Sequence, residues 1–332
     1  MTAFPPIEQR PIPGSSATPS VLGIVLEPPV TAAPAVDRGI VGALRRARER
    51  GITTFDLAHG GPLARAERLI AAAFPDPDPA LLFIVGRSWS MPPDFPRSTG
   101  RDRGEPSDPL RDLEVTLEGD VRRISTHGSV LVDFDGGDAP PERIRDAAKI
   151  LDRHRAEGRI SGWSLHRPST TNGSSLDPVV RSGALCVELS LLDRSALGPL
   201  VERASLGPLG VLVRDPFARG RLDGTRFAET LGERGPSAAP LDVRSLHAEF
   251  DPVLRLGFLT RGHRRTLAQA ALLFLFRWPW VSSVLVPLPR PERWEEVLGA
   301  SSAPPLDATE LDELGVHLSV TGSDGFSAVR SS

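Results

Sequence analysis

Tyrosine is absent from this sequence of 332 residues, and lysine and cysteine each occur once, as Lys149 and Cys186. Without tyrosine, no mechanism can use a phenolic acid. The single cysteine excludes an internal disulfide, and no Cys or His residues have metal-ligand spacing. We therefore expect no bound metal and a reducing, cytoplasmic location.

Strong charge and long apolar runs are also missing. The 39 Lys and Arg residues nearly balance the 42 Asp and Glu residues, so no overall field favours nucleic acid or an anionic membrane. The longest apolar run, Ala268 to Phe276, is too short to cross a bilayer, and the first residues do not form a signal-peptide pattern. We expect a small-molecule metabolite as the partner, with an anionic one as an option, and the sequence leaves the oligomeric state open.

Short β-branched runs alternate with amphipathic stretches, which is typical of parallel strands joined by crossover helices. The predicted strands are 21–26, 52–57, 81–85, 130–134, 160–165, 185–189, 210–214 and 281–286. The predicted helices include 63–74, 140–157, 266–277 and one that Asp37 is expected to cap. Eight such units without a break in composition predict one α/β domain over 1–332, a (β/α)₈ TIM barrel. Within it we expect a lead segment at 1–19, a long loop at 88–106 and a flexible tail at 319–332.

Several segments, in order, resemble conserved motifs of the aldo/keto reductase family. They are GITTFDLA (51–58), AEGRISGWS (156–164), DPFARGRLDG (215–224), AQAAL (268–272), SVLVP (283–287) and EEVLG (295–299). The resemblance implies that the chemistry lies at the carboxyl ends of the barrel strands, with NADPH lying across them.

The family's catalytic tetrad is mostly replaced at the matching positions. Its Asp is present as Asp56, but the Tyr position holds Gly61, the Lys position Arg87 and the His position Asp135. We predict that Asp56, Arg87 and Asp135 form a charged cluster at the barrel mouth, with Arg87 binding an anion. A simple ion pair between Arg87 and Asp135 is the structural alternative.

The cofactor positions that the resemblance implies are also altered. The nicotinamide contacts fall on Ser164 and on Cys186 in place of a Gln, and the stacking aromatic falls on Arg214. At the adenosine end the matching residues are Arg290, Arg293 and Glu296, but the expected Asn is Val297. NADP(H) binding is therefore doubtful, and we expect no cofactor.

Two histidines are the alternative proton donors, because imidazole titrates near neutral pH. His59 follows the second predicted strand, and His166 follows the fifth. Each could instead be a solvated loop histidine. We interpret Cys186 as an unreactive thiol that is buried in a strand and only fills space there. Glu188 and Asp215 could line the pocket.

These replacements favour a diverged enzyme that carries out acid/base chemistry on a small polar metabolite without a cofactor, as a lyase, dehydratase, isomerase or cyclase. One alternative is an NADP(H)-dependent oxidoreductase with an unusual proton donor. Another is a non-catalytic binding or scaffold barrel. The Arg-rich, Lys-poor composition is typical of a GC-rich genome and suggests specialised metabolism.

Overall fold

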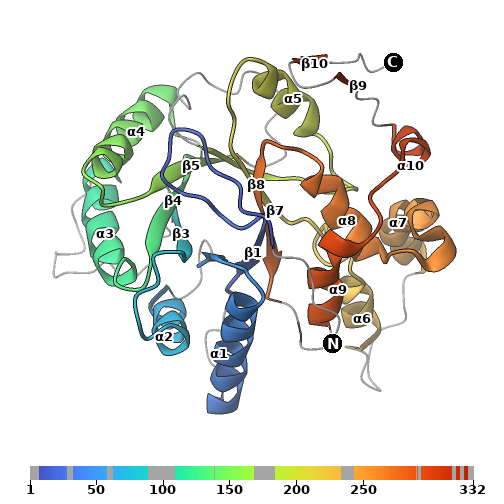
Figure 1. The fold of residues 1–332 in the computed structure, drawn as a ribbon, viewed down its shortest axis with the longest axis horizontal. Coiled ribbons are helices and arrows are strands. Elements are labelled where there is room, and N and C mark those ends of the chain that lie inside the picture. Colours follow the sequence, from blue (N-terminus) through green and yellow to red (C-terminus); the bar gives the residue numbers. More distant parts are fainter. Residues whose placement is uncertain are drawn as a thin grey trace.

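Eight parallel strands close into a barrel, with helices packed around it (Figure 1). The computed structural model describes residues 7–27, 33–57, 63–88, 109–137, 139–167, 184–232, 243–288, 290, 293–315, 319–321 and 325–327. Of the predicted 88–106 loop, Ser88 is described as the last residue of a strand, and the rest lies outside these ranges, as does His59.

The strands follow one another around the barrel in chain order, and the last pairs with the first. They are β1 (Leu22–Val25), β2 (Thr54–Asp56), β3 (Leu82–Ser88), β4 (Ser129–Asp135), β5 (Gly162–Arg167), β6 (Ala184–Glu188), β7 (Val211–Arg214) and β8 (Val281–Pro287). Each predicted strand overlaps one of them, which confirms the predicted (β/α)₈ barrel.

The helices lie outside the strands, as Figure 1 shows. They are α1 (Pro34–Glu49), α2 (Leu63–Ala73), α3 (Pro109–Ile124), α4 (Pro141–Ala156), α5 (Leu197–Ser205), α6 (Thr225–Gly232), α7 (Val243–Leu254), α8 (Leu267–Phe276), α9 (Trp294–Leu298) and α10 (Ala308–Glu313). The expected cap at Asp37 is wrong. Ala33 is the N-cap of α1 and Pro34 is its first residue, because proline already has the helical φ and lacks the N–H that would go unpaired there.

Alternate residues of each strand face opposite sides of the barrel wall, and two apolar clusters result. One fills the space between the strands and the helices and includes Phe55, Phe83 and Trp163. The other fills the barrel interior and includes Ile84, Leu131, Ala184, Cys186, Leu212 and Leu285. This alternation decides which polar residues reach the interior.

The predicted lead segment closes the bottom of the barrel. Ile12 and Ala17 belong to the interior cluster, and Gln9 forms an isolated antiparallel bridge with Ser20. The guanidinium of Arg10 donates to the carbonyl oxygens of residues 276, 278 and 281 at 2.8–3.0 Å. These contacts fix the segment across the amino ends of the strands and leave the carboxyl ends for a site.

The predicted tail contains an antiparallel pair, β9 (Ser319–Thr321) with β10 (Gly325–Ser327). Among the described residues no helix is both long and apolar enough to span a membrane.

Candidate active site

A layer of polar side chains caps the apolar interior at the carboxyl ends of the strands. Leu131, Ala184 and Leu212 point into the barrel. Side chains two residues apart on a strand point to the same side, so Asp133, Cys186 and Arg214 also point inward, two residues nearer the carboxyl end of each strand. The side chains that meet there, called the mouth cluster below, are Asp56, Asp133, Ser164, His166, Cys186 and Arg214. Such a layer is where barrel enzymes place their chemistry.

Arg214 is the central cation of the mouth cluster. Its Nη2 lies 2.5 Å from Asp56 Oδ2 and 3.5 Å from Asp133 Oδ2, so it joins strands on opposite sides of the barrel. Both carboxylates are fully buried. Although burial alone disfavours the charged form of Arg214, the carboxylates of Asp56 and Asp133 and the Cys186 sulfur raise its pKa above the ordinary value. Arg214 is therefore a permanent cation inside the barrel mouth.

Asp133 also organises the next strand. Its Oδ1 accepts a 2.6 Å hydrogen bond from Ser164 Oγ, and its Oδ2 lies 3.3 Å from His166 Nδ1. Burial would lower the pKa of His166, but the hydrogen bond with Asp133 and the charge of that carboxylate raise it above the ordinary value. The imidazole is 16% exposed and is thus the part of this dyad nearest to the mouth.

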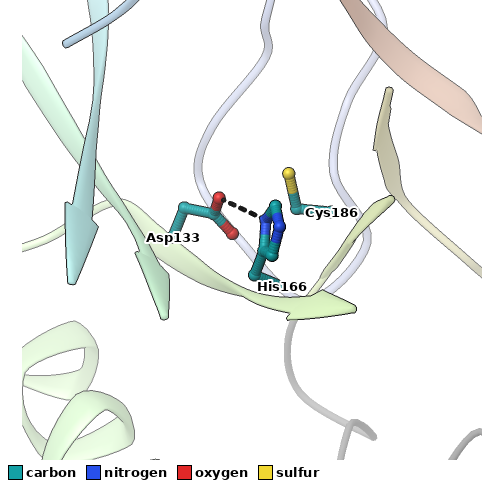
Figure 2. Close-up of side chains that lie close together, drawn as sticks. All are labelled: Asp133, His166 and Cys186. Carbon is teal, nitrogen blue, oxygen red and sulfur yellow. Dashed lines mark hydrogen bonds and ion pairs between the residues drawn. The ribbon is translucent and has the colours of Figure 1, made fainter. Parts of the chain in front are cut away.

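Cys186 stands beside the dyad on β6 (Figure 2). The thiol is fully buried, and burial together with the charges of Asp133 and Asp56 raises its pKa well above the ordinary value. One donor atom each from Asp133, His166 and Cys186 lies within 4.8 Å of the others.

The predicted cluster of Asp56, Arg87 and Asp135 does not form, because Arg87 points the other way. Leu82 and Ile84 face the interior, so Arg87, an odd number of residues along β3, faces the helices. There it pairs with Asp120 of α3. Burial and the nearby Arg123 lower the pKa of Arg87 to about 10. The predicted role of Arg87 as an anion clamp at the mouth is therefore wrong, and so is the alternative pairing with Asp135.

Asp135 shares the inward parity of Asp133 but lies at the rim. Its Oδ1 accepts a 2.8 Å hydrogen bond from the backbone N–H of Gly137, which is the bond of a turn that ends the strand. In the sheet register it is the partner of His166, whose pKa its charge helps to raise. Asp135 is thus a neighbour of the dyad and lies outside the Arg214 ion pairs.

The positions expected to bind a cofactor have partners within the chain. The hydroxyl of Ser164 is donated to Asp133. Arg293 Nε lies 2.7 Å from Glu296 Oε2, and its Nη2 donates to the Asp223 carbonyl at 2.5 Å, so it joins α9 to the loop after β7. Arg290 is exposed.

A polar cavity of about 600 Å³ lies at the ends of β6 and β7, and its lining begins with Glu188 and Asp215, which follow Cys186 and Arg214 along the chain. Its charged lining residues are Glu188, Asp193, Asp215, Arg219, Arg221, Arg226 and Glu249. Asp215 has a left-handed φ of 51°, which is uncommon for a residue other than glycine, and its Oδ1 accepts a 2.6 Å hydrogen bond from the Arg219 N–H. Burial raises the pKa of Asp215. With both signs of charge on its walls, the cavity suits a small, strongly polar ligand.

The most important omission of the sequence analysis is Asp133, which binds or contacts most of the mouth cluster. In the sequence, Arg214 and Cys186 stand out only as departures from the cofactor contacts that the resemblance implies. Strand parity could have found them, because each lies two residues beyond an apolar interior position.

Comparisons with known proteins agree with this architecture. No protein-family model and no curated protein sequence matches the chain. Among solved structures, the holo form of an aldo-keto reductase from Bacillus halodurans is similar, with a TM-score of 0.67 and 18% identity over 93% of this chain and 95% of that one. The chain has the aldo-keto reductase fold.

Two further structures show the same fold. A glycerol dehydrogenase from Gluconobacter oxydans has a TM-score of 0.67 and 15% identity over 95% of both chains. An aldo/keto reductase from Klebsiella pneumoniae, solved with NADP and acetate, has a TM-score of 0.60 and 18% identity over 90% of this chain and 91% of that one. The resemblance seen in the sequence motifs is thus confirmed for the fold.

Proposed function

We propose that the protein is an enzyme that uses the aldo-keto reductase barrel for acid/base chemistry, without hydride transfer, on a small polar metabolite. The observation that carries this proposal is the guanidinium of Arg214, which bridges Asp56 and Asp133 at the barrel mouth. By the sequence resemblance, this position belongs to an aromatic ring that stacks on nicotinamide. There the Arg214 side chain is committed to two carboxylates and offers no aromatic face on which the ring could stack.

The other mouth residues also fit a nicotinamide ring poorly. Ser164 already donates its hydroxyl to Asp133, and Cys186 offers a buried thiol in place of an amide. The chain also has no tyrosine to protonate an alkoxide, a step to which a positioned acid contributes a factor of about 10²–10⁴. These residues therefore argue against hydride transfer in the way that the sequence resemblance implies.

The same residues can bind a charged substrate and move a proton. Asp133 holds the His166 ring through Nδ1, and the imidazole keeps 16% of its surface exposed at the mouth, where a substrate can approach it. The Arg214 side chain is 14% exposed, so the guanidinium can attract an anionic group at the mouth. The adjoining cavity would hold the polar remainder of the metabolite. We propose His166 as the proton-exchanging group and Arg214 as the anion-binding group.

A second candidate is an NADP(H)-dependent oxidoreductase with an unusual proton donor. It is favoured by the fold shared with a reductase solved with NADP and by the retention of Arg290, Arg293 and Glu296 at the adenosine end. In that function water or His59 would need to provide the proton, and a metabolite would have to reach Asp56 past Arg214.

Solvent isotope exchange can test the proposal before the substrate is known. The protein is incubated in D₂O with a panel of hydroxy acids, amino acids and sugar acids, and deuterium incorporation or product formation is followed by NMR. The variants are His166→Gln and, as a control, His247→Gln, which changes an exposed histidine of α7. NADPH and NADP⁺ are titrated separately by fluorescence and calorimetry.

We expect labelling or turnover without nucleotide, a loss of about 10²-fold or more in His166→Gln, and no change in His247→Gln. Submillimolar affinity for NADPH together with turnover that requires it would overturn the proposal in favour of the oxidoreductase. Tight binding of a metabolite without labelling or turnover would indicate a binding protein instead.

A further inference from the structure

Three different metal-binding side chains converge in the mouth cluster (Figure 2). Asp133, His166 and Cys186 come from the neighbouring strands β4, β5 and β6 and offer an oxygen, a nitrogen and a sulfur atom within 4.8 Å of one another. Bond lengths to zinc of about 2.0–2.3 Å put the ligand atoms of a tetrahedral site about 3.3–3.8 Å apart. The donors therefore need only a small closing movement.

The spacing between Asp133 and His166 fits two ligands of one ion as well as it fits the hydrogen bond that joins them. Their Oδ2 and Nδ1 atoms are 3.3 Å apart, whereas charge-assisted N–H···O bonds are usually about 2.7–2.9 Å long. A separation of 3.3 Å is ordinary for two ligands of one tetrahedral ion.

The scaffold fixes these donors in place. In the sheet register, Asp133 pairs with Ser164, and His166 pairs with Cys186, so the ligands occupy adjacent inward positions. Ser164 donates to Oδ1 of Asp133 and so leaves Oδ2 directed at His166. A hydrogen bond from an outer residue that orients a ligating carboxylate is a regular feature of metal sites.

The local charges also balance around a divalent cation. Arg214 is paired with Asp56 at 2.5 Å, so this pair contributes no net charge. A thiolate at Cys186 and the carboxylate of Asp133 would offset the two charges of the ion.

We propose that Asp133, His166 and Cys186 bind one divalent transition metal ion of the zinc type, with a fourth position open to water or substrate. Thiolate and imidazole ligands favour zinc, cobalt or iron over magnesium and calcium. Three protein ligands with an open position are typical of catalytic zinc sites, where the metal-bound water supplies the acid or base. This reading of the metal's role rests on the proposed function, but binding itself can be measured without a substrate.

Cobalt substitution tests the site because Cys186 is the only cysteine in the chain. Co²⁺ is titrated into chelator-treated full-length protein while the near-ultraviolet and visible spectra are recorded. A thiolate-to-cobalt charge-transfer band can come from no other sulfhydryl in the molecule. The variants are Cys186→Ser, Asp133→Asn and His166→Gln, each close in size to the native residue, with His247→Gln as the control.

We expect one Co²⁺ per chain, a thiolate band with the visible spectrum of a tetrahedral ion, and displacement by Zn²⁺. Cys186→Ser should abolish the band, and the other two ligand variants should weaken binding by about 10–100-fold or more. His247→Gln should bind as the native chain does, and circular dichroism checks the fold of each variant.

Wild-type protein that shows no thiolate band at millimolar Co²⁺ would overturn the proposal, whatever the variants do. So would tight binding that Cys186→Ser leaves unchanged, because the ion would then lie elsewhere. The deuterium-exchange assay separates the two proposals. Exchange that is insensitive to chelator, without cobalt binding, would leave the acid/base function and remove the metal. Cobalt binding without exchange would leave the metal site and remove the acid/base function.

Discussion

The buried ion pair between Arg214 and Asp56 should be essential to stability, and Arg214→Met tests this. Methionine matches the length of the arginine stem but removes the charge, so two fully buried carboxylates would lose their cation. Removing one partner of a buried ion pair usually costs about 3–5 kcal/mol. With an unfolding entropy of about 2.1 cal/mol/K per residue and 332 residues, the melting temperature should fall by about 4–7 °C.

A second substitution distinguishes lost attraction from damaged packing. In Arg214→Met/Asp56→Asn one of the two stranded charges is replaced by a neutral amide of the same shape, so the double variant should be less destabilised than the sum of the single variants by about 0.5–3 kcal/mol. Urea unfolding followed by circular dichroism and calorimetric melting measure the cycle.

The control is the exposed pair of Arg255 and Asp251, whose side chains are 80% and 50% exposed. Arg255→Met should change stability by no more than about 0.5 kcal/mol, since screened surface pairs contribute little. If Arg214→Met is as stable as this control, or if the cycle shows no coupling, the ion pair does not hold the mouth cluster together and the reasoning fails.

Three further predictions concern residues outside the mouth cluster. Arg87→Met should cost about 1–3 kcal/mol in the urea assay, because the buried Asp120 loses one of its two cations and keeps Arg123. Deuterium exchange by the folded protein should be unchanged, and a loss of exchange would show that Arg87 belongs to the active site after all. Gly128→Ala should cost about 1–3 kcal/mol in the same assay, because the new Cβ would lie 2.7 Å from the Leu81 carbonyl oxygen. His154 should make stability pH-dependent, since burial and then the nearby arginines lower its pKa from 6.5. The neutral imidazole contributes fully to the free energy of unfolding above pH 6.5, and this contribution is lost as the pH falls toward the lowered pKa. In His154→Leu the urea midpoint should therefore depend less on pH between about pH 7.5 and about pH 5.5.

Most of the fold could be predicted from the sequence because hydrophobic periodicity is a local property. The runs of apolar residues that become β4 and β8 are bounded by polar or turn residues, and α8 has a clear apolar composition. The expected cap at Asp37 failed because a side chain suited to capping does not decide where a helix begins. Pro34 fixed the start three residues earlier.

The site was predicted less well because residues were placed by family position without regard to strand parity. Parity alone sends Arg87 of β3 to the helices, since Leu82 and Ile84 face inward. Asp133 and Asp135 share the inward parity, and their depth separates them, because Asp133 is fully buried whereas Asp135 lies at the rim. The partner of Arg214 could not be read from any local pattern, because β7 and β2 meet only across the closed barrel.

Under the proposed function, the ion pair also connects the absence of a nicotinamide site with the presence of Asp56. A carboxylate that is fully buried needs a cation, and none of the described residues on β3 supplies it from inside the barrel once Arg87 faces outward. Arg214 supplies it from β7, at the position that the resemblance assigns to the stacking aromatic. Asp56 could not then be neutralised without placing a permanent charge where the ring would lie. Restoring the aromatic alone should therefore destabilise the barrel before it restores a ring site, and only a substitution that also neutralises Asp56 could open that space.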